Sequence, residues 1–114
     1  MRRRYIKFRL KMRYAWRGIK YVWKTQKSFR WQIIIGIIAN LILWNSTVLI
    51  LTALILSLEV LNTAIERLCD FVHPKLNNAI GLIKDISAGS VLVSCIIAVI
   101  YGFILLIQKV LIYI

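Results

Sequence analysis

Acidic residues are scarce in this sequence, and their scarcity argues against an ordinary soluble domain. The 114 residues include 4 Asp and Glu against 16 Lys and Arg, which gives a formal net charge of +12. No charged residue occurs between Gln32 and Leu58. A soluble domain of this length needs a large polar shell, yet 61% of the residues are hydrophobic. Uncharged apolar stretches of this kind predict membrane-spanning helices of ~20 residues each.

Cysteine and proline are also rare. Cys69 and Cys95 lie far apart in apolar surroundings without metal-ligand spacing, so we assign them no role. The single proline, Pro74, predicts the end of a helix because proline interrupts helical hydrogen bonding. No small-residue cleavage site follows the first apolar run, Ile33–Ile38, and we therefore expect no cleaved secretory signal.

The basic residues are concentrated near the N-terminus. Twelve of the 16 lie between Arg2 and Arg30, a stretch without acid. Apolar and aromatic side chains recur among them at helical spacing, namely Phe8, Met12, Ala15, Trp16, Ile19, Val22, Trp23 and Phe29. The pattern predicts an amphipathic helix over residues 5–27 in the headgroup region of a membrane. Basic runs also bind nucleic acid, but the aromatic stripe favours lipid, and no nucleic-acid partner is expected.

Three spans are predicted after this helix, over residues 28–44, 47–72 and 84–110. Asn45-Ser46-Thr47 supplies the first turn, and a polar link that contains His73 and Pro74 supplies the second. The expected fold is therefore a single all-α integral membrane domain over residues 1–114. The positive-inside rule places the N-terminus in the cytoplasm.

Small residues recur every four positions in the third predicted span, at Ser90, Ser94, Ala98 and Gly102. Small side chains at this spacing let another helix approach closely. We expect this stripe to serve helix packing, some of it between subunits.

Three of the four acids share one face of the second predicted span. Glu59, Glu66 and Asp70 fall within about 40° of one another on a helix, and Asn62 and Thr63 flank them. Ionisable groups inside a span are costly and usually mark function or pairing. Because clustered carboxylates repel, they either take up protons or hold a cation. An oxygen-only set suits Mg²⁺, which commonly binds carboxylates together with substrate phosphates.

The residues that follow extend this hypothesis. Lys84 could hold a phosphate, Asp85 could position a ligand, and a deeper carboxylate could accept a proton from a lipid hydroxyl. These parts suit phosphoryl transfer, in which positioning and charge neutralisation supply most of the catalysis. Structural alternatives remain open: ion pairs of Glu66 with Arg67 or of Asp70 with Lys75, a helix-capping role for Asp85, and a loop role for His73.

At these residues the chain resembles the prokaryotic diacylglycerol kinase and undecaprenol kinase family. The matching runs are Glu59-Val-Leu-Asn62-Thr63-Ala-Ile-Glu66, then Asp70, then Lys84-Asp85-Ile-Ser-Ala88-Gly89-Ser-Val91, and, near the N-terminus, Tyr14-Ala-Trp16-Arg17-Gly18-Ile19 with Trp23, Phe29 and Arg30. The resemblance covers nearly the whole chain.

The resemblance implies a homotrimer of three-span subunits in a bacterial inner membrane, which transfers the γ-phosphate of ATP to a lipid alcohol with Mg²⁺. It implies that Glu59 is the catalytic base and that Glu66 and the residue at position 26 hold the metal. A nucleotide site is implied at Lys7, Tyr14, Asn62, Asp70, Lys84 and Asp85, and lipid contacts at Trp16, Trp23, Phe29 and Arg30.

Two positions depart from the family pattern, and the change at Gln26 is the more serious. Gln26 stands where the family normally places a metal-binding Glu, and Gln32 is neutral where some members carry an acid. Gln26 keeps a carbonyl oxygen but loses the charge, so metal affinity should fall. Ala88-Gly89 and His73-Pro74 look more like the undecaprenol branch, with diacylglycerol as the alternative acceptor.

Two other classes of function are alternatives to a kinase. A cation channel needs a continuous polar face, and the outer half of the second span offers only Thr52. That argues against a pore. A catalytically silent membrane subunit stays open, because the change at Gln26 is one that such a protein could show.

Overall fold

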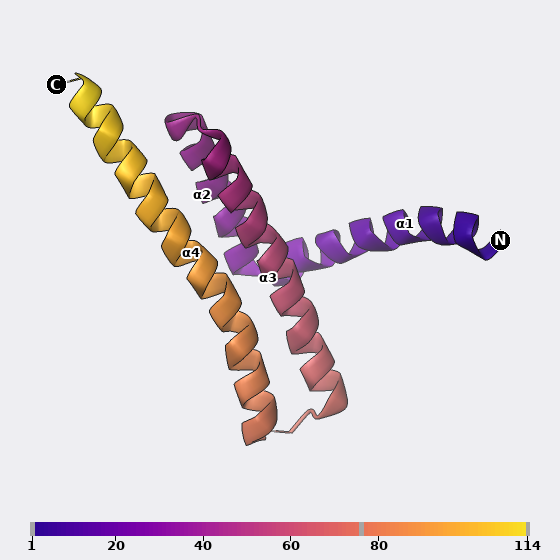
Figure 1. Cartoon of the computed structure of the whole chain (residues 1–114). Coiled ribbons are helices and arrows are strands. Elements are labelled where there is room, and N and C mark those ends of the chain that lie inside the picture. The colour runs from indigo at the N-terminus through magenta and orange to yellow at the C-terminus, as the bar shows by residue number, and fades with distance from the viewer. Residues whose placement is uncertain (1, 76, 114) are drawn as a thin grey trace.

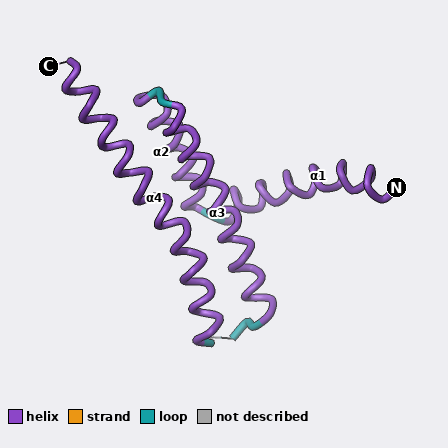
Figure 2. Tube along the Cα trace, in the orientation of Figure 1, coloured by secondary structure: helices purple, strands orange, loops and turns teal. Residues whose placement is uncertain are grey.

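The computed structural model describes the backbone of residues 2–75 and 77–113, and side chains from residue 8 onward within these ranges. Four helices account for nearly all of it: α1 (Arg2–Thr25), α2 (Lys27–Leu43), α3 (Ser46–Val72) and α4 (Asn78–Tyr113). Strands are absent from the described ranges, and only short loops join the helices (Figure 2). The all-α fold class predicted from the sequence is thus confirmed.

Helix α1 leaves the bundle to one side and meets it partway along α3 (Figure 1). The bend lies at Gln26, whose backbone is extended at φ −110° and ψ 102°. Val22 and Phe29 on either side of the bend are buried, whereas Phe8, Met12 and Trp16 are at least 60% exposed. The predicted apolar stripe of α1 therefore contacts little protein before the bend, as expected for a helix that faces lipid.

Polar groups from three helices build the turn between α2 and α3. Trp44 ends α2 in the left-handed region with φ 44°, and the Asn45 side chain accepts a hydrogen bond from the Thr47 amide at 2.8 Å. Lys109 on α4 donates to the last carbonyls of α2, at 3.3 Å to Ile42 and 2.6 Å to Leu43. These contacts satisfy groups that a helix end otherwise leaves unpaired.

Helices α2 and α3 approach closely at Gly36. A Cβ atom at Gly36 would lie 2.6 Å from Cγ2 of Thr52. The Asn40 side chain donates to the Gly36 carbonyl at 2.6 Å and to the Thr52 hydroxyl at 3.1 Å. The absence of a side chain at Gly36 therefore sets how closely the two helices pack.

Helices α3 and α4 run antiparallel side by side and meet at the loop after Val72 (Figure 1). Helix α4 begins at Asn78, earlier than the predicted start at Lys84. The reason is local: the Asn77 side chain accepts hydrogen bonds from the amides of Ala79 and Ile80, and so caps the helix. The second half of the predicted polar link is therefore helical.

The small-residue stripe of α4 lies partly within the chain's own packing. Ser94 is buried and Gly102 lies 3.7 Å from the Leu43 side chain, whereas Ser90 is exposed. A role of the exposed part in contacts between subunits stays a prediction.

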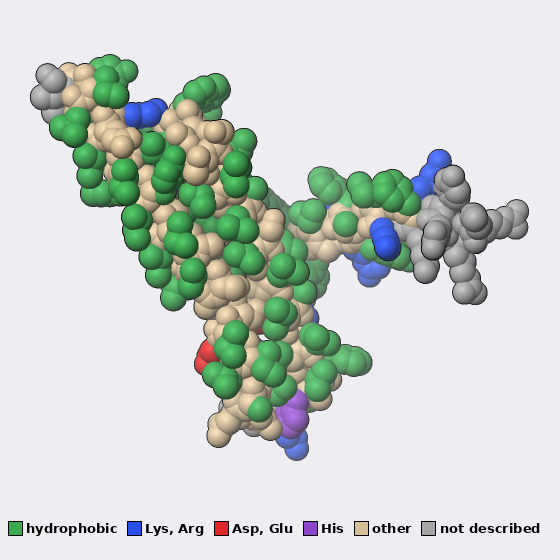
Figure 3. All heavy atoms as spheres, viewed as in Figure 1, with side chains coloured by type: hydrophobic (Ala, Val, Ile, Leu, Met, Phe, Trp, Pro, Cys, Tyr) green, Lys and Arg blue, Asp and Glu red, His purple; other side chains and the backbone are tan. Residues whose placement is uncertain are grey.

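The chain is apolar outside and partly polar inside. Hydrophobic side chains cover most of the visible surface of the bundle (Figure 3). The buried residues include Glu59, Asn62, Thr63, Ser87 and Ser94. The radius of gyration, 17.9 Å, exceeds the roughly 13 Å expected of a compact domain of this length.

Two helices, α3 and α4, are long and apolar enough to cross a membrane. Only 22% and 11% of their most apolar windows is buried, unlike the core helices of soluble proteins. Helix α2 has 17 residues and falls short of the same criterion. A bundle with this surface needs a membrane or further copies of itself around it.

Candidate functional site

The polar core of the bundle is centred on α3. Glu59, Asn62 and Thr63 are 7%, 8% and 3% exposed, although most of α3 is apolar. The Thr63 hydroxyl donates to the Glu59 carbonyl at 3.0 Å, within the same helix. Of the predicted stripe, Glu59 with the flanking Asn62 and Thr63 faces the protein interior, whereas Glu66 is half-buried and Asp70 is exposed.

Glu59 lies against the first turns of α2. Its two carboxylate oxygens accept hydrogen bonds from the Ser28 hydroxyl at 3.2 Å and from the Gln32 side-chain amide at 3.3 Å. Two donors on adjacent turns of α2 hold the carboxylate in one orientation. The site therefore holds a buried, oriented carboxylate in apolar surroundings.

The next turn of α3 carries a second polar pair. The Asn62 side-chain amide donates to the Glu66 carboxylate at 3.2 Å. The Asn62 carbonyl oxygen Oδ1 is buried and has no hydrogen-bond partner among the described residues. An unsatisfied buried oxygen is costly, and it is available to a ligand.

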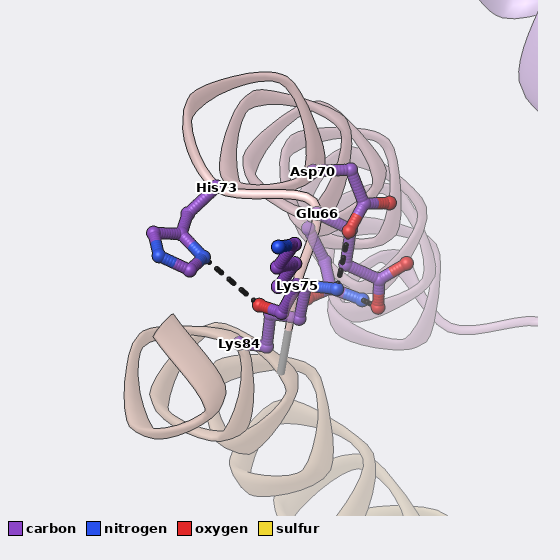
Figure 4. Close-up of polar contacts among 6 residues, drawn as sticks. Glu66, Asp70, His73, Lys75 and Lys84 are labelled. Carbon is purple, nitrogen blue, oxygen red and sulfur yellow. Dashed lines mark hydrogen bonds and ion pairs between the residues drawn. The ribbon is translucent and has the colours of Figure 1, made fainter. Parts of the chain in front are cut away.

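Further along α3, Asp70 pairs with Lys84 of α4 across the loop (Figure 4). The ammonium and carboxylate atoms are 2.5 Å apart, and the side chains are 36% and 51% exposed. The alternative pairing of Asp70 with Lys75 is not formed. His73 contacts the Lys75 backbone carbonyl at 3.0 Å, which agrees with its predicted loop role.

Asp85 is exposed beside this pair and does not cap α4, since the helix starts at Asn78. The capping alternative for Asp85 is therefore wrong. Asp85 lines an open surface hollow of about 800 Å³ together with Asn77, Asn78, Gly81 and Leu82. This hollow can admit a polar ligand.

The acids of α3 do not converge into one cluster within the chain. No group of three or more His, Cys, Asp or Glu suited to a metal ion occurs among the described residues. The residues that fit a metal are Glu66 and Asn62, because they offer a carboxylate and a free carbonyl oxygen side by side. This oxygen-only set suits a hydrated Mg²⁺ completed by other ligands.

The predicted residues of α1 and its junction lie in varied surroundings. Tyr14, Trp16 and Trp23 are exposed at 58%, 61% and 45%, and Gln26 is half-buried at the bend. Lys7 lies outside the residues whose side chains are described.

Two predicted lipid contacts lie deeper. Phe29 is 4% exposed and packs within the protein. The Arg30 Nε atom is buried and lacks a partner among the described residues. Their predicted contact with lipid remains a prediction.

Sequence reasoning missed the partners of Glu59. Ser28 was read only as the start of a span, and Gln32 only as a neutral replacement. Their spacing of four residues at the start of α2 places both on one helix face, and this signal could have linked them to a buried acid.

A cavity of about 360 Å³ lies between α2, α3 and α4, and Gln32 lines it. Apart from Gln32, Thr52 and Cys95, its lining is apolar or Gly. Since Gln32 also holds Glu59, the cavity lies beside the buried carboxylate.

Comparison with known proteins adds the family. The prokaryotic diacylglycerol kinase family matches residues 13–106. A protein of Synechocystis sp. named diacylglycerol kinase is 38% identical over 108 residues, which cover 87% of this chain and 62% of that protein. Proteins of the same name from Escherichia coli and Shigella flexneri are each 31% identical over 101 residues, which cover 82% of this chain and 83% of those proteins.

The matched region contains the whole of the polar core, from Ser28 on α2 to Lys84 and Asp85 on α4. The chain spans less than two thirds of the Synechocystis protein and most of the Escherichia coli one. The apolar helices and the buried carboxylate agree with this match. The chain belongs to the prokaryotic diacylglycerol kinase family of membrane lipid kinases.

Proposed function

We propose that the protein catalyses ATP- and Mg²⁺-dependent phosphorylation of a membrane lipid alcohol. The observation that carries the proposal is the buried Glu59 carboxylate, which two donors hold beside an apolar cavity in a chain of this family. A lipid hydroxyl needs a base at the boundary between lipid and water, and Glu59 meets that need.

Glu59 takes the proton of the lipid hydroxyl as its oxygen bonds to the γ-phosphorus of ATP, while the bond from that phosphorus to the β–γ bridging oxygen breaks and ADP leaves. Ser28 and Gln32 hold both carboxylate oxygens, so the base is aimed before the acceptor arrives. Preorganised groups of this kind need little rearrangement during the reaction.

Glu66 and Asn62 hold the divalent cation, with Gln26 as a neutral third donor. Mg²⁺, when bound, neutralises charge on the transferring phosphate. The free Asn62 carbonyl oxygen beside the Glu66 carboxylate supports this assignment.

Lys84, with Asp70 and Asp85 beside it, binds the nucleotide phosphates. In the free protein Lys84 is held by Asp70, which keeps the ammonium near the site. Tyr14 and Lys7 of α1 are proposed to contribute to the nucleotide site, and Trp16, Trp23 and Arg30 to contact lipid, whereas Phe29 is buried within the protein.

Helix lengths support a three-span topology with a cytoplasmic N-terminus. With α1 on the membrane surface, α2 starts at that surface and rises ~25 Å, close to the hydrocarbon thickness of ~30 Å. Glu59 is then level with the headgroups because it contacts Ser28, and the residues from Asn62 to Asp85 project toward the cytoplasm. Glu59 is thus at the level of the lipid hydroxyl, and the residues from Asn62 to Asp85 are on the side from which ATP arrives.

A homotrimer is proposed to complete the site. The three acids of α3 do not converge in one chain, and the exposed apolar faces of α3 and α4 leave room for neighbouring copies. The exposed Ser90 in the small-residue stripe supports close packing at such a contact.

Diacylglycerol is the acceptor that the names of the relatives support. Undecaprenol, which the Ala88-Gly89 pair favours, is the competing acceptor. The two share one hydroxyl chemistry and differ in the lipid that surrounds it, so only assay can separate them.

The test follows label from γ-labelled ATP into each lipid in mixed micelles, across a range of Mg²⁺ concentrations. The proposal predicts a labelled phospholipid product with diacylglycerol at least as good an acceptor as undecaprenol. No labelled product with either lipid, for the wild type and for Gln26→Glu, would identify a silent homologue and overturn the proposal.

A further inference from the structure

Ser87 differs from the other serines of α4. The Ser90 and Ser94 hydroxyls donate to backbone carbonyls three residues earlier, at 2.6 Å and 2.7 Å. The Ser87 hydroxyl is buried, at 7% residue exposure, and has no hydrogen-bond partner among the described residues. A buried hydroxyl left unpaired costs roughly 1–3 kcal/mol, so the position calls for an explanation.

The register of α3 against α4 puts Ser87 within one residue of the position opposite Glu66. Asp70 faces Lys84 at one level, and Glu59 lies near Cys95 at another. In each pair the two residue numbers have the same sum, as two antiparallel helices in constant register require. One turn from the Asp70–Lys84 pair, the same sum sets Glu66 opposite Ala88; Ala88 is exposed, whereas the adjacent Ser87 is buried on the side of α4 that packs against α3.

Two unsatisfied buried oxygens therefore accompany one carboxylate at this level. Asn62 Oδ1 is unpaired and its amide already holds Glu66, while Ser87 Oγ is an unpaired oxygen that α4 buries close to this level. Of the neighbouring cations, Lys84 is engaged by Asp70, and Arg67 lies over the Tyr21 ring. A carboxylate beside two unpaired neutral oxygens favours a ligand that is positively charged and also donates hydrogen bonds. A hydrated divalent cation meets both needs, since the ion supplies the charge and its water molecules supply the O–H groups.

We propose that Ser87 is a further positioning residue of the phosphoryl-transfer site, whose hydroxyl accepts a hydrogen bond from the water shell of the divalent cation held by Glu66 and Asn62. This inference rests on the proposed function. It adds a residue from α4 to a metal site otherwise built on α3, so it ties cation binding to the α3–α4 contact. Groups that hold a metal's water or ligands typically affect affinity about 10-fold or more.

The test measures Mn²⁺ binding to the full-length protein in lipid nanodiscs by electron paramagnetic resonance, with a non-hydrolysable ATP analogue present. Ser87→Ala is expected to weaken Mn²⁺ binding about 10-fold. Ser87→Gly removes the same hydroxyl together with the Cβ atom and should give the same loss of Mn²⁺ binding. Ser90→Ala is the matched control, because its hydroxyl is satisfied within α4, and should bind Mn²⁺ as the wild type does.

Thermal stability without metal separates positioning from packing. Removing an unsatisfied buried hydroxyl should leave the metal-free midpoint unchanged or raised. The stabilisation produced by added Mn²⁺ should shrink in Ser87→Ala and not in Ser90→Ala.

The outcomes separate this inference from the proposed function. Normal Mn²⁺ affinity in Ser87→Ala, with weakened affinity in Asn62→Ala, overturns the role of Ser87 and leaves the kinase proposal standing. Failure of the wild type to bind Mn²⁺ with the nucleotide analogue overturns both.

Discussion

Gly36 offers the sharpest test of how helix packing supports the site. In Gly36→Ala the new methyl group meets Thr52 Cγ2 at 2.6 Å, well inside normal contact. Thr52 cannot rotate away freely, because its hydroxyl donates to the Val48 carbonyl at 2.8 Å and accepts from Asn40 at 3.1 Å. Helices α2 and α3 must therefore separate or Thr52 must give up these bonds.

The expected magnitude follows from two opposing effects. Overpacking of this kind typically costs about 1–3 kcal/mol. Alanine is a better helix former than glycine by up to about 1 kcal/mol. Because the gain in helix propensity offsets part of the overpacking cost, we expect a net loss of up to about 2 kcal/mol in the free energy of unfolding. Reversible unfolding in mixed detergent micelles measures it.

Matched variants make this test specific. Gly18→Ala adds a methyl group where no atom lies within 4 Å and should not destabilise. Thr52→Ser removes the clashing methyl group, and the double variant with Gly36→Ala should recover much of the loss. Activity should fall along with stability, since α2 carries Ser28 and Gln32 to Glu59. Gly36→Ala as stable as Gly18→Ala, with no rescue by Thr52→Ser, would refute the packing argument.

Three further predictions address the metal, the nucleotide and the outer turn. Gln26→Glu restores a charged ligand and should lower the Mg²⁺ concentration needed for half-maximal activity; an unchanged requirement counts against Gln26 at the metal. Lys84→Gln should raise the KM for ATP about 10-fold, because the loss of one charged hydrogen bond weakens binding by about that factor. Steady-state kinetics measure this, and an unchanged KM would remove Lys84 from the nucleotide site. Lys109→Met removes the donor to the C-terminus of α2 and should lower unfolding free energy by about 1 kcal/mol, whereas equal stability in the micelle assay would show that this contact contributes nothing.

Much of the fold was predictable because helical periodicity and apolar length are local signals. Asn45 is an example of such a local signal, because Asn is a common N-cap residue and Asn45 caps the start of α3. The start of α4 was missed because Asn77 caps it within a polar segment that resembles a loop. Local composition could not decide between a long link and an early helix.

The α3 half of the site was predictable and the α2 half was not. Acids on one face of an apolar helix stand out in a sequence, because the membrane makes each of them costly. Ser28 and Gln32 are ordinary polar residues near a helix start, and only the packing of α2 on α3 brings them to Glu59. The pairing of Asp70 with Lys84 likewise depends on the path of the chain between two helices.

The most direct test of the central claim is the rate of phosphate transfer to lipid by Glu59→Gln. This variant keeps the shape of the side chain and removes the base. Glu59→Gln should lower kcat by about 10²–10⁴-fold and leave the oligomer unchanged. Ser57→Ala is the control, because its exposed hydroxyl donates a hydrogen bond within α3, and it should retain full activity. A Glu59→Gln protein that turns over at the wild-type rate would contradict the assignment of Glu59 as the base.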